Sequence, residues 1–153
     1  MFFKKTYWLF IFCIMAMSTI DYQICKAEII MDNAPPNFAI VDYKIIDSKN
    51  DNNICDLSFK LITKNRGDQP IYNVKVSLVK EPEQVAVHKK EVFTPIISSQ
   101  ETIIISDVID ISINNCEQIE TLPFTWSIEY DDVNNNHLKG EIIINFRRHL
   151  LCF

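Results

Sequence analysis

Hydrophobic and polar residues alternate along most of the chain beyond residue 37, and this period of two is typical of β-strands with one buried face. In one such segment Cys55, Leu57, Phe59 and Leu61 alternate with polar residues. The same pattern, complete or interrupted, predicts further strands at 39–45, 72–78, 84–93, 102–113, 124–130 and 138–146.

No segment after residue 27 shows the 3.6-residue period of an amphipathic helix. Seven short strands separated by polar turns predict an all-β fold, an immunoglobulin-like sandwich of about seven antiparallel strands in two sheets over 38–147. A lead-in at 28–37 precedes this domain, and a short apolar tail at 148–153 follows it. We expect Trp126 to fill the core, and we interpret the break at Ser106 and Asp107 as a β-bulge.

The N-terminal 27 residues have the features of a secretory signal peptide, which would form a signal helix before the domain. Lys4 and Lys5 precede an apolar run at 7–17, too short for the roughly 20 residues that cross a bilayer. Small residues at Cys25 and Ala27 predict cleavage between Ala27 and Glu28. The alternative is an uncleaved anchor. Cleavage implies an extracytoplasmic protein, in the periplasm, at the cell surface or secreted.

Composition excludes several classes of function. The 153 residues suffice for one domain, and 48% hydrophobic residues can form a core. Fifteen Lys and Arg against 20 Asp and Glu give a net charge of −5, which disfavours nucleic acid as a partner. With 2 glycines, no nucleophile elbow and no metalloprotease motif, we expect no enzyme activity and no cofactor.

Three cysteines, Cys55, Cys116 and Cys152, follow the predicted cleavage point. In an oxidising compartment one pair can form a disulfide. Cys55 with Cys116 is our first choice, which would leave Cys152 over. The alternative, that all three are free thiols, carries equal weight.

Histidines and acidic residues suggest no metal site. His88, His137 and His149 are too scattered for a shared ligand spacing, so we expect them on the surface. The spacing Asp132-x-Asn134-x-Asn136 matches the first oxygen ligands of a calcium loop. However, His137 stands where that loop needs glycine, and Ile143 stands where it needs a chelating glutamate. A polar hairpin turn is therefore the prediction.

The tripeptide Arg66-Gly67-Asp68 is one that integrins read, and it falls at a predicted turn. Because Gly-Asp is ordinary turn chemistry, we interpret it as a turn and not as an adhesion site.

The segments 57–67 and 71–78 resemble the second and third strands of bacterial cell-surface immunoglobulin-like modules of the CARDB (cell-adhesion-related, bacterial) type. Asn65 and Gly67 occupy the positions of that family's Asn-x-Gly turn, and 124–126 resembles its later aromatic strand. The resemblance covers 38–147, and the chain lacks the Asn-rich closing segment of the family. It implies a non-catalytic extracytoplasmic module and supplies no binding residues.

Two functions follow from these features. The first is a secreted or periplasmic module that binds a protein or glycan through its loops or a free sheet edge. For the tail 148–153, the alternatives are packing against the edge of the sandwich and docking on a partner. The alternative to such a module is a small carrier of a lipid or other apolar ligand, because 126–132 resembles the late hairpin of ML-type lipid-recognition domains. The cysteines do not match that family. A cavity between the sheets would favour the carrier, and a filled core would favour the module.

Overall fold

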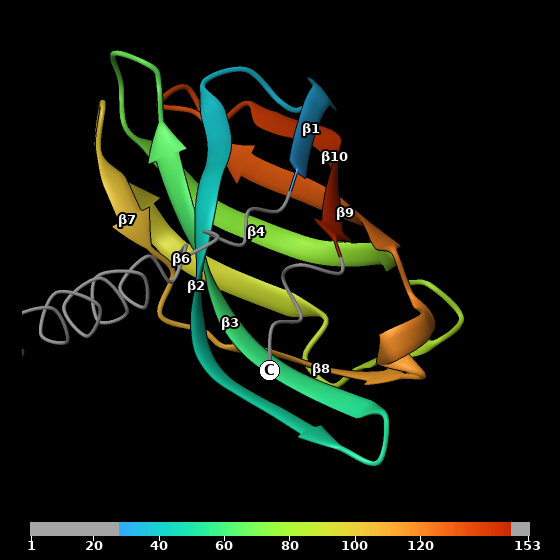
Figure 1. Cartoon of the computed structure of the whole chain (residues 1–153). Coiled ribbons are helices and arrows are strands. Elements are labelled where there is room, and N and C mark those ends of the chain that lie inside the picture. The colour runs from blue at the N-terminus through green and yellow to red at the C-terminus, as the bar shows by residue number, and fades with distance from the viewer. Residues whose placement is uncertain (1–27, 148–153) are drawn as a thin grey trace, which may run out of the picture.

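The computed structural model describes residues 28–147, and these form an all-β protein (Figure 1). Its elements are β1 (Glu28–Asn33), β2 (Phe38–Asp51), β3 (Ile54–Asn65), β4 (Ile71–Lys80), β5 (Val85–Val87), β6 (Glu91–Ile97), β7 (Thr102–Ile104), β8 (Ile109–Asn114), the 3-10 helix η1 (Cys116–Gln118), β9 (Thr121–Asp131) and β10 (His137–Arg147). The predicted signal peptide 1–27 and the tail 148–153, with His149 and Cys152, lie outside the described residues.

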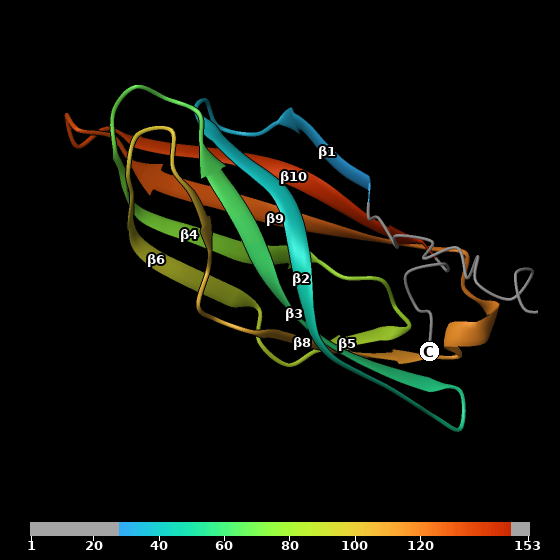
Figure 2. The same ribbon diagram turned by 60° about the vertical axis from the view of Figure 1, so that its left-hand side comes forward.

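The strands form two antiparallel sheets that face each other (Figure 2). The first sheet has the order β1-β10-β9-β4-β6, and the second has the order β2-β3-β8-β5, with β7 also paired to β3. The expected all-β, two-sheet architecture is therefore confirmed.

Large side chains fill the space between the sheets. Along β3 the predicted inward residues, from Cys55 to Leu61, are all buried. Phe146 contributes a ring centred 5.3 Å from that of Phe59 and 5.4 Å from that of Phe124. Trp126 is buried within the same core cluster, as expected from its place in an alternating strand. Burial of these apolar faces is the main stabilising contribution to such a fold.

The sequence underestimated the number of strands. Residues 28–33 of the expected lead-in form β1, which pairs with β10. The segment 84–93 divides between β5 in one sheet and the start of β6 in the other. The segment 102–113 divides into β7 and β8, so the expected bulge at Ser106 and Asp107 is wrong. The carboxylate of Asp107 instead accepts hydrogen bonds from Lys89 Nζ (2.7 Å) and from Phe93 N (3.1 Å), which link the β7–β8 connection to the chain around the start of β6.

The link between β1 and β2 crosses from one sheet to the other, and it packs closely on β10. A Cβ atom at Gly140 would lie 2.4 Å from the carbonyl oxygen of Asn33 and 2.6 Å from Pro35 Cδ. Only glycine allows this approach. On the other side of the link, the hydroxyl of Tyr130 donates a hydrogen bond to the carbonyl oxygen of Pro36, and the Tyr130 ring stacks on Phe38 at 6.5 Å.

The hydrogen bond from Tyr130 to Pro36 should stabilise the folded state. Tyr130→Phe keeps the ring and removes only the donor, so we expect the free energy of unfolding to fall by about 1 kcal/mol. Urea denaturation measures the change. Tyr72→Phe, on the neighbouring strand β4, is the matched control, and an equal loss in both variants would contradict a specific role for the Tyr130 hydroxyl.

Candidate functional site

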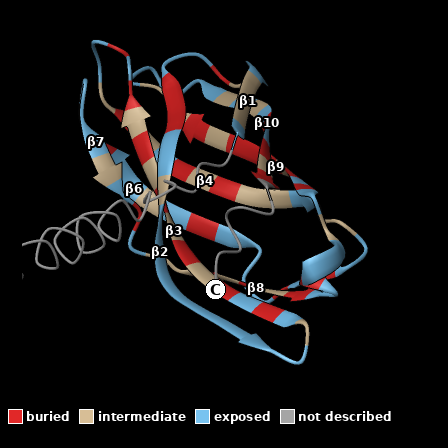
Figure 3. Cartoon of the chain, viewed as in Figure 1, coloured by how far each residue is buried: buried red, intermediate tan, exposed pale blue. Residues whose placement is uncertain are grey.

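The outer strand β2 is the longest edge strand of the described structure. It is 14 residues long and pairs on one side only, with β3. Its first residues, Phe38 to Ile40, are buried, whereas most residues from Val41 onward are exposed (Figure 3). The far part of the β2–β3 hairpin projects beyond the body of the sandwich (Figures 1 and 2). A free strand edge presents unpaired backbone N–H and C=O groups that another strand can use.

Two irregularities in the ladder change which side chains of β2 face the core. The register with β3 shifts between Ile40 and Asp42, and again between Ile45 and Asp47. Val41 and Ile46 are the extra residues at these bulges, and their side chains are 40% and 48% exposed. The expected inward series of Ala39, Val41, Tyr43 and Ile45 is therefore only partly right. Phe38 and Ile40 are buried before the first bulge, and the Tyr43 ring packs on Phe146 at 5.5 Å after it.

The other sheet edges carry features that discourage strand addition. At one edge, β1 is 6 residues long and is interrupted by a register shift between Ile30 and Asn33. At the opposite edge, β6 contains Pro95, which lacks a backbone donor. In the second sheet, β5 and β7 are 3 residues each. By length and exposure, β2 stands apart from these strands.

The Asn65-x-Gly67 turn is held by a buried amide. The Asn65 side chain is fully buried, and its Oδ1 accepts a hydrogen bond from Gly67 N at 2.9 Å. Its Nδ2 donates to three backbone carbonyls, those of Gln69 (2.7 Å), Ser98 (3.1 Å) and Ile97 (3.2 Å). The turn between β3 and β4 is thereby fixed to the loop that joins β6 and β7.

This arrangement also restrains the tripeptide Arg66-Gly67-Asp68. Gly67 is buried, and its carbonyl oxygen accepts a hydrogen bond from Ser99 Oγ at 3.1 Å. Arg66 N donates to the carbonyl oxygen of Asn37 at 2.6 Å. Both outer residues are exposed, but the backbone between them belongs to a packed turn. The structure thus agrees with the turn interpretation.

Cys55 and Cys116 form a disulfide, with Cα atoms 5.9 Å apart. This is the pair that the sequence analysis placed first. Cys55 lies near the start of β3 and Cys116 starts η1, and both are buried. The bond ties the projecting β2–β3 hairpin to the end of β8.

A serine, a histidine and an aspartate meet on the outer face of the second sheet. His88 Nε2 lies 3.2 Å from Ser112 Oγ, and Ser112 Oγ donates to Asp56 Oδ1 at 2.6 Å. Nucleophilic catalysis requires the histidine to take the serine proton and the carboxylate to orient the histidine. Here the hydroxyl donates directly to the carboxylate, and His88 is exposed. This geometry does not activate Ser112.

The calcium-like spacing is a side-chain-stabilised turn. Asp132 Oδ1 accepts hydrogen bonds from Asn134 N (2.8 Å) and Asn136 N (2.9 Å), and Asp132 Oδ2 accepts one from Asn136 Nδ2 (2.8 Å). These bonds, with the Asn136 amide first, lower the pKa of Asp132. Residues 28–147 contain no group of three or more histidine, cysteine or acidic side chains placed to hold a metal.

The same end of the first sheet carries further ionised groups. Asp131 accepts a hydrogen bond from Asn73 Nδ2 (2.8 Å), and His137 Nδ1 lies 2.9 Å from its other oxygen. These contacts lower the pKa of Asp131. Similarly, Lys139 Nζ, at 2.7 Å, lowers the pKa of Glu129. The cluster is an exposed network across β4, β9 and β10.

These carboxyl groups should make the stability of the fold depend on pH. Their pKa values are lower in the folded state than the ordinary values of 3.8 for aspartate and 4.5 for glutamate. The ionised groups therefore stabilise the fold at any pH above these ordinary values. This stabilisation is lost as the pH falls through the folded-state values. We expect the urea midpoint to hold down to about pH 4.5 and to fall below it. Asp131→Asn/Asp132→Asn should flatten the fall, whereas Asp68→Asn, at an exposed turn residue, should not. Equal acid sensitivity in both variants would contradict the assignment.

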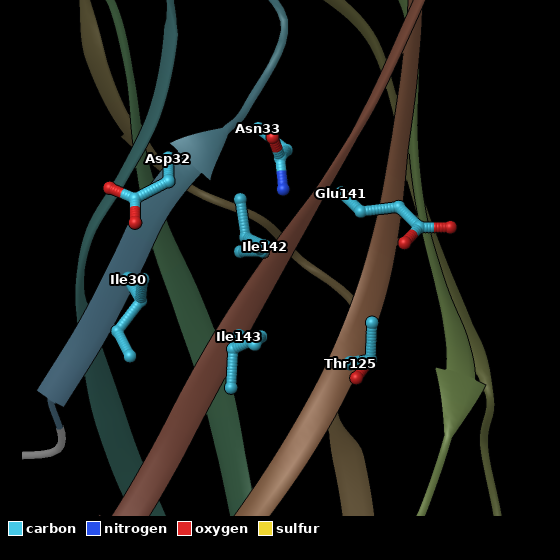
Figure 4. Close-up of a pocket in the computed structure, with 7 residues that line it drawn as sticks. All are labelled: Ile30, Asp32, Asn33, Thr125, Glu141, Ile142 and Ile143. Carbon is cyan, nitrogen blue, oxygen red and sulfur yellow. The ribbon is translucent and has the colours of Figure 1, made fainter.

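A pocket of about 260 Å³ lies on the outer face of the first sheet, not between the sheets (Figure 4). It forms beside the register shift of β1, where Ile30 pairs with Ile143 of β10 and Asn33 pairs with Glu141, and Thr125 of β9 also lines it. The carboxylates of Asp32 and Glu141 stand on opposite sides of it (Figure 4). The pocket lacks the converging polar groups of a ligand site.

No family model matches the chain, and comparisons with curated proteins and with solved structures also give no match. Within residues 28–147, no helix has the length and apolarity required to cross a membrane. The resemblance to CARDB-type modules therefore rests on the Asn65-x-Gly67 turn, its two strands and the segment 124–126.

Sequence reasoning expected a free sheet edge but did not say which strand would form it. The adjacent apolar residues Ile40-Val41 and Ile45-Ile46 interrupt the alternation at both bulges. They are the one signal in the sequence that could have located the irregular strand.

Proposed function

We propose that this protein is an exported, non-enzymatic, immunoglobulin-like module that binds a protein partner by strand addition at the free edge of β2. The observation that carries the proposal is the edge itself, a 14-residue outer strand that is exposed from Val41 onward except at Tyr43. In strand addition, backbone hydrogen bonds supply affinity and alternate side chains supply specificity. The exposed Val41 and Ile46 would be the apolar contacts.

The filled core favours this function over the lipid carrier. Trp126, Phe124 and Phe146 occupy the space between the sheets with at most 2% exposure. A carrier would need that space for an apolar ligand, as cavities of drug-sized ligands span roughly 300–1,000 Å³. The pocket on the outer face, in contrast, has carboxylates on opposite sides and is open to solvent.

Export is part of the proposal. The basic and apolar N-terminal segment, with cleavage between Ala27 and Glu28, supports it. The disulfide between Cys55 and Cys116 is also typical of oxidising compartments outside the cytosol. A periplasmic, cell-surface or secreted location fits both features.

Site-specific photocrosslinking in the native host tests the binding surface. A benzophenone amino acid would replace Val41 or Ile46 in the full chain, with Val79 of β4, 56% exposed, as the matched control. We expect a discrete crosslinked product from each β2 position and none from residue 79. The absence of a product from both β2 positions, with the protein folded and exported, would overturn the proposal.

A further inference from the structure

Charged side chains alternate in sign along the exposed part of β2. Asp42, Lys44, Asp47 and Lys49 all lie on the outer face of the second sheet, because they pair with outward residues of β3. Those partners are Ile62, Lys60, Ser58 and Asp56 in the same order. The order of charges along the edge is therefore negative, positive, negative, positive.

We propose that the partner of β2 is the β2 strand of a second copy of this chain. The two strands would pair antiparallel about a two-fold axis, with Asp42 opposite Lys49 and Lys44 opposite Asp47. Because of the two-fold symmetry, each of these opposite-charge pairs occurs twice in the dimer. This inference rests on the proposed function of the β2 edge and names the partner.

The bulge at Ile46 makes this register possible. In a regular strand, residues 42 and 49 are an odd number of positions apart and point to opposite faces. The extra residue shifts the phase, so both face outward in this structure. Shifting the register by two residues would place Asp42 opposite Asp47 or Asp51, where like charges destabilise the pairing. One register is therefore electrostatically selected.

Lys44 supplies an independent reason for an acidic partner. It lies directly across the ladder from Lys60, and like charges in that position repel. Among residues 28–147, Lys44 has no ion pair within 4.0 Å. In the dimer, Asp47 of the second copy would lie on its other side.

The apolar side chains near the middle of β2 also fit the proposed two-fold axis. Ile45 and Ile46 are both partly exposed, and in the selected register Ile45 of one copy faces Ile46 of the other. Pairing would remove them from water and join the two second sheets into one continuous sheet. The projection of the hairpin away from the sandwich leaves room for the second copy (Figure 2).

Charge variants of the edge test the register. The full chain would be produced in an exporting host, purified, and studied by sedimentation velocity over about a hundredfold range of concentration. The acidic-edge variant is Lys44→Asp/Lys49→Asp, and the basic-edge variant is Asp42→Lys/Asp47→Lys. All these positions are exposed, and unchanged thermal unfolding would show that the fold is intact.

We expect the wild-type chain to form a dimer. Each variant alone should self-associate about a hundredfold more weakly, because its substitutions turn the opposite-charge pairs into like-charge pairs. An equimolar mixture of the two variants should recover the dimer. A wild-type monomer at every concentration would overturn the second-copy assignment, and so would an acidic-edge variant that dimerises normally. If the wild type is monomeric while residues 41 and 46 crosslink to a different protein, the proposed function stands and this inference fails.

Discussion

Replacing both Cys55 and Cys116 by alanine is expected to lower the free energy of unfolding by about 4 kcal/mol. The bond joins residues 61 positions apart, and closing so long a loop removes much of the conformational freedom of the unfolded chain. Both cysteines are buried, so alanine avoids placing a polar group in the core. Urea denaturation of the oxidised wild type and the double variant would measure the loss.

Two controls distinguish the contribution of the disulfide to stability from that of the cysteine side chains. A reducing agent should bring the wild type close to the double variant and should leave the double variant unchanged. Cys152→Ser, in the tail, should behave as the wild type does. If the wild-type urea midpoint did not respond to reduction, the disulfide could not be a source of stability.

Asn65→Ala should have an effect of similar size, about 3–5 kcal/mol, because removing the amide leaves several buried backbone groups without a partner. The amide serves Gly67 N and three carbonyl groups, one in the turn before β4 and two at and just after the end of β6. Alanine has neither the donor nor the acceptor, and water has little access to a fully buried site. Thermal and urea unfolding would measure the loss.

Asn65→Asp sharpens this test, because it keeps the shape and replaces the donating nitrogen with an oxygen. That oxygen would face the carbonyls of Gln69, Ile97 and Ser98, so we expect at least as large a loss. Asn50→Ala, on the exposed part of β2, is the control and should change stability little. A mild effect of both substitutions at Asn65 would show that the turn does not depend on this amide.

The sequence predicted those parts of the fold that follow from local alternation. Leu57, Phe59 and Leu61 alternate with polar residues and are buried as expected. Trp126 likewise belongs to the core. Such a strand has one hydrophobic face, and the fold must bury that face whichever strands lie beside it.

The sequence did not reveal features that depend on pairing between distant segments. The segment 84–93 is divided because β5 pairs with β8 and β6 pairs with β4, and the segment 102–113 forms two strands that each pair with β3. The exposure of β2 follows from its outer place in the sheet order, which alternation cannot encode. The role of Asn65 was visible only as a turn residue, because its carbonyl partners at 97 and 98 lie far along the chain.

The first and last described strands are hydrogen-bonded neighbours, since β1 pairs with β10. The first sheet can therefore be completed only after the C-terminal part of the chain has been synthesised. Contacts between such distant segments form slowly. In the export that we propose, the first sheet would therefore be completed only after translocation of the C-terminal strand.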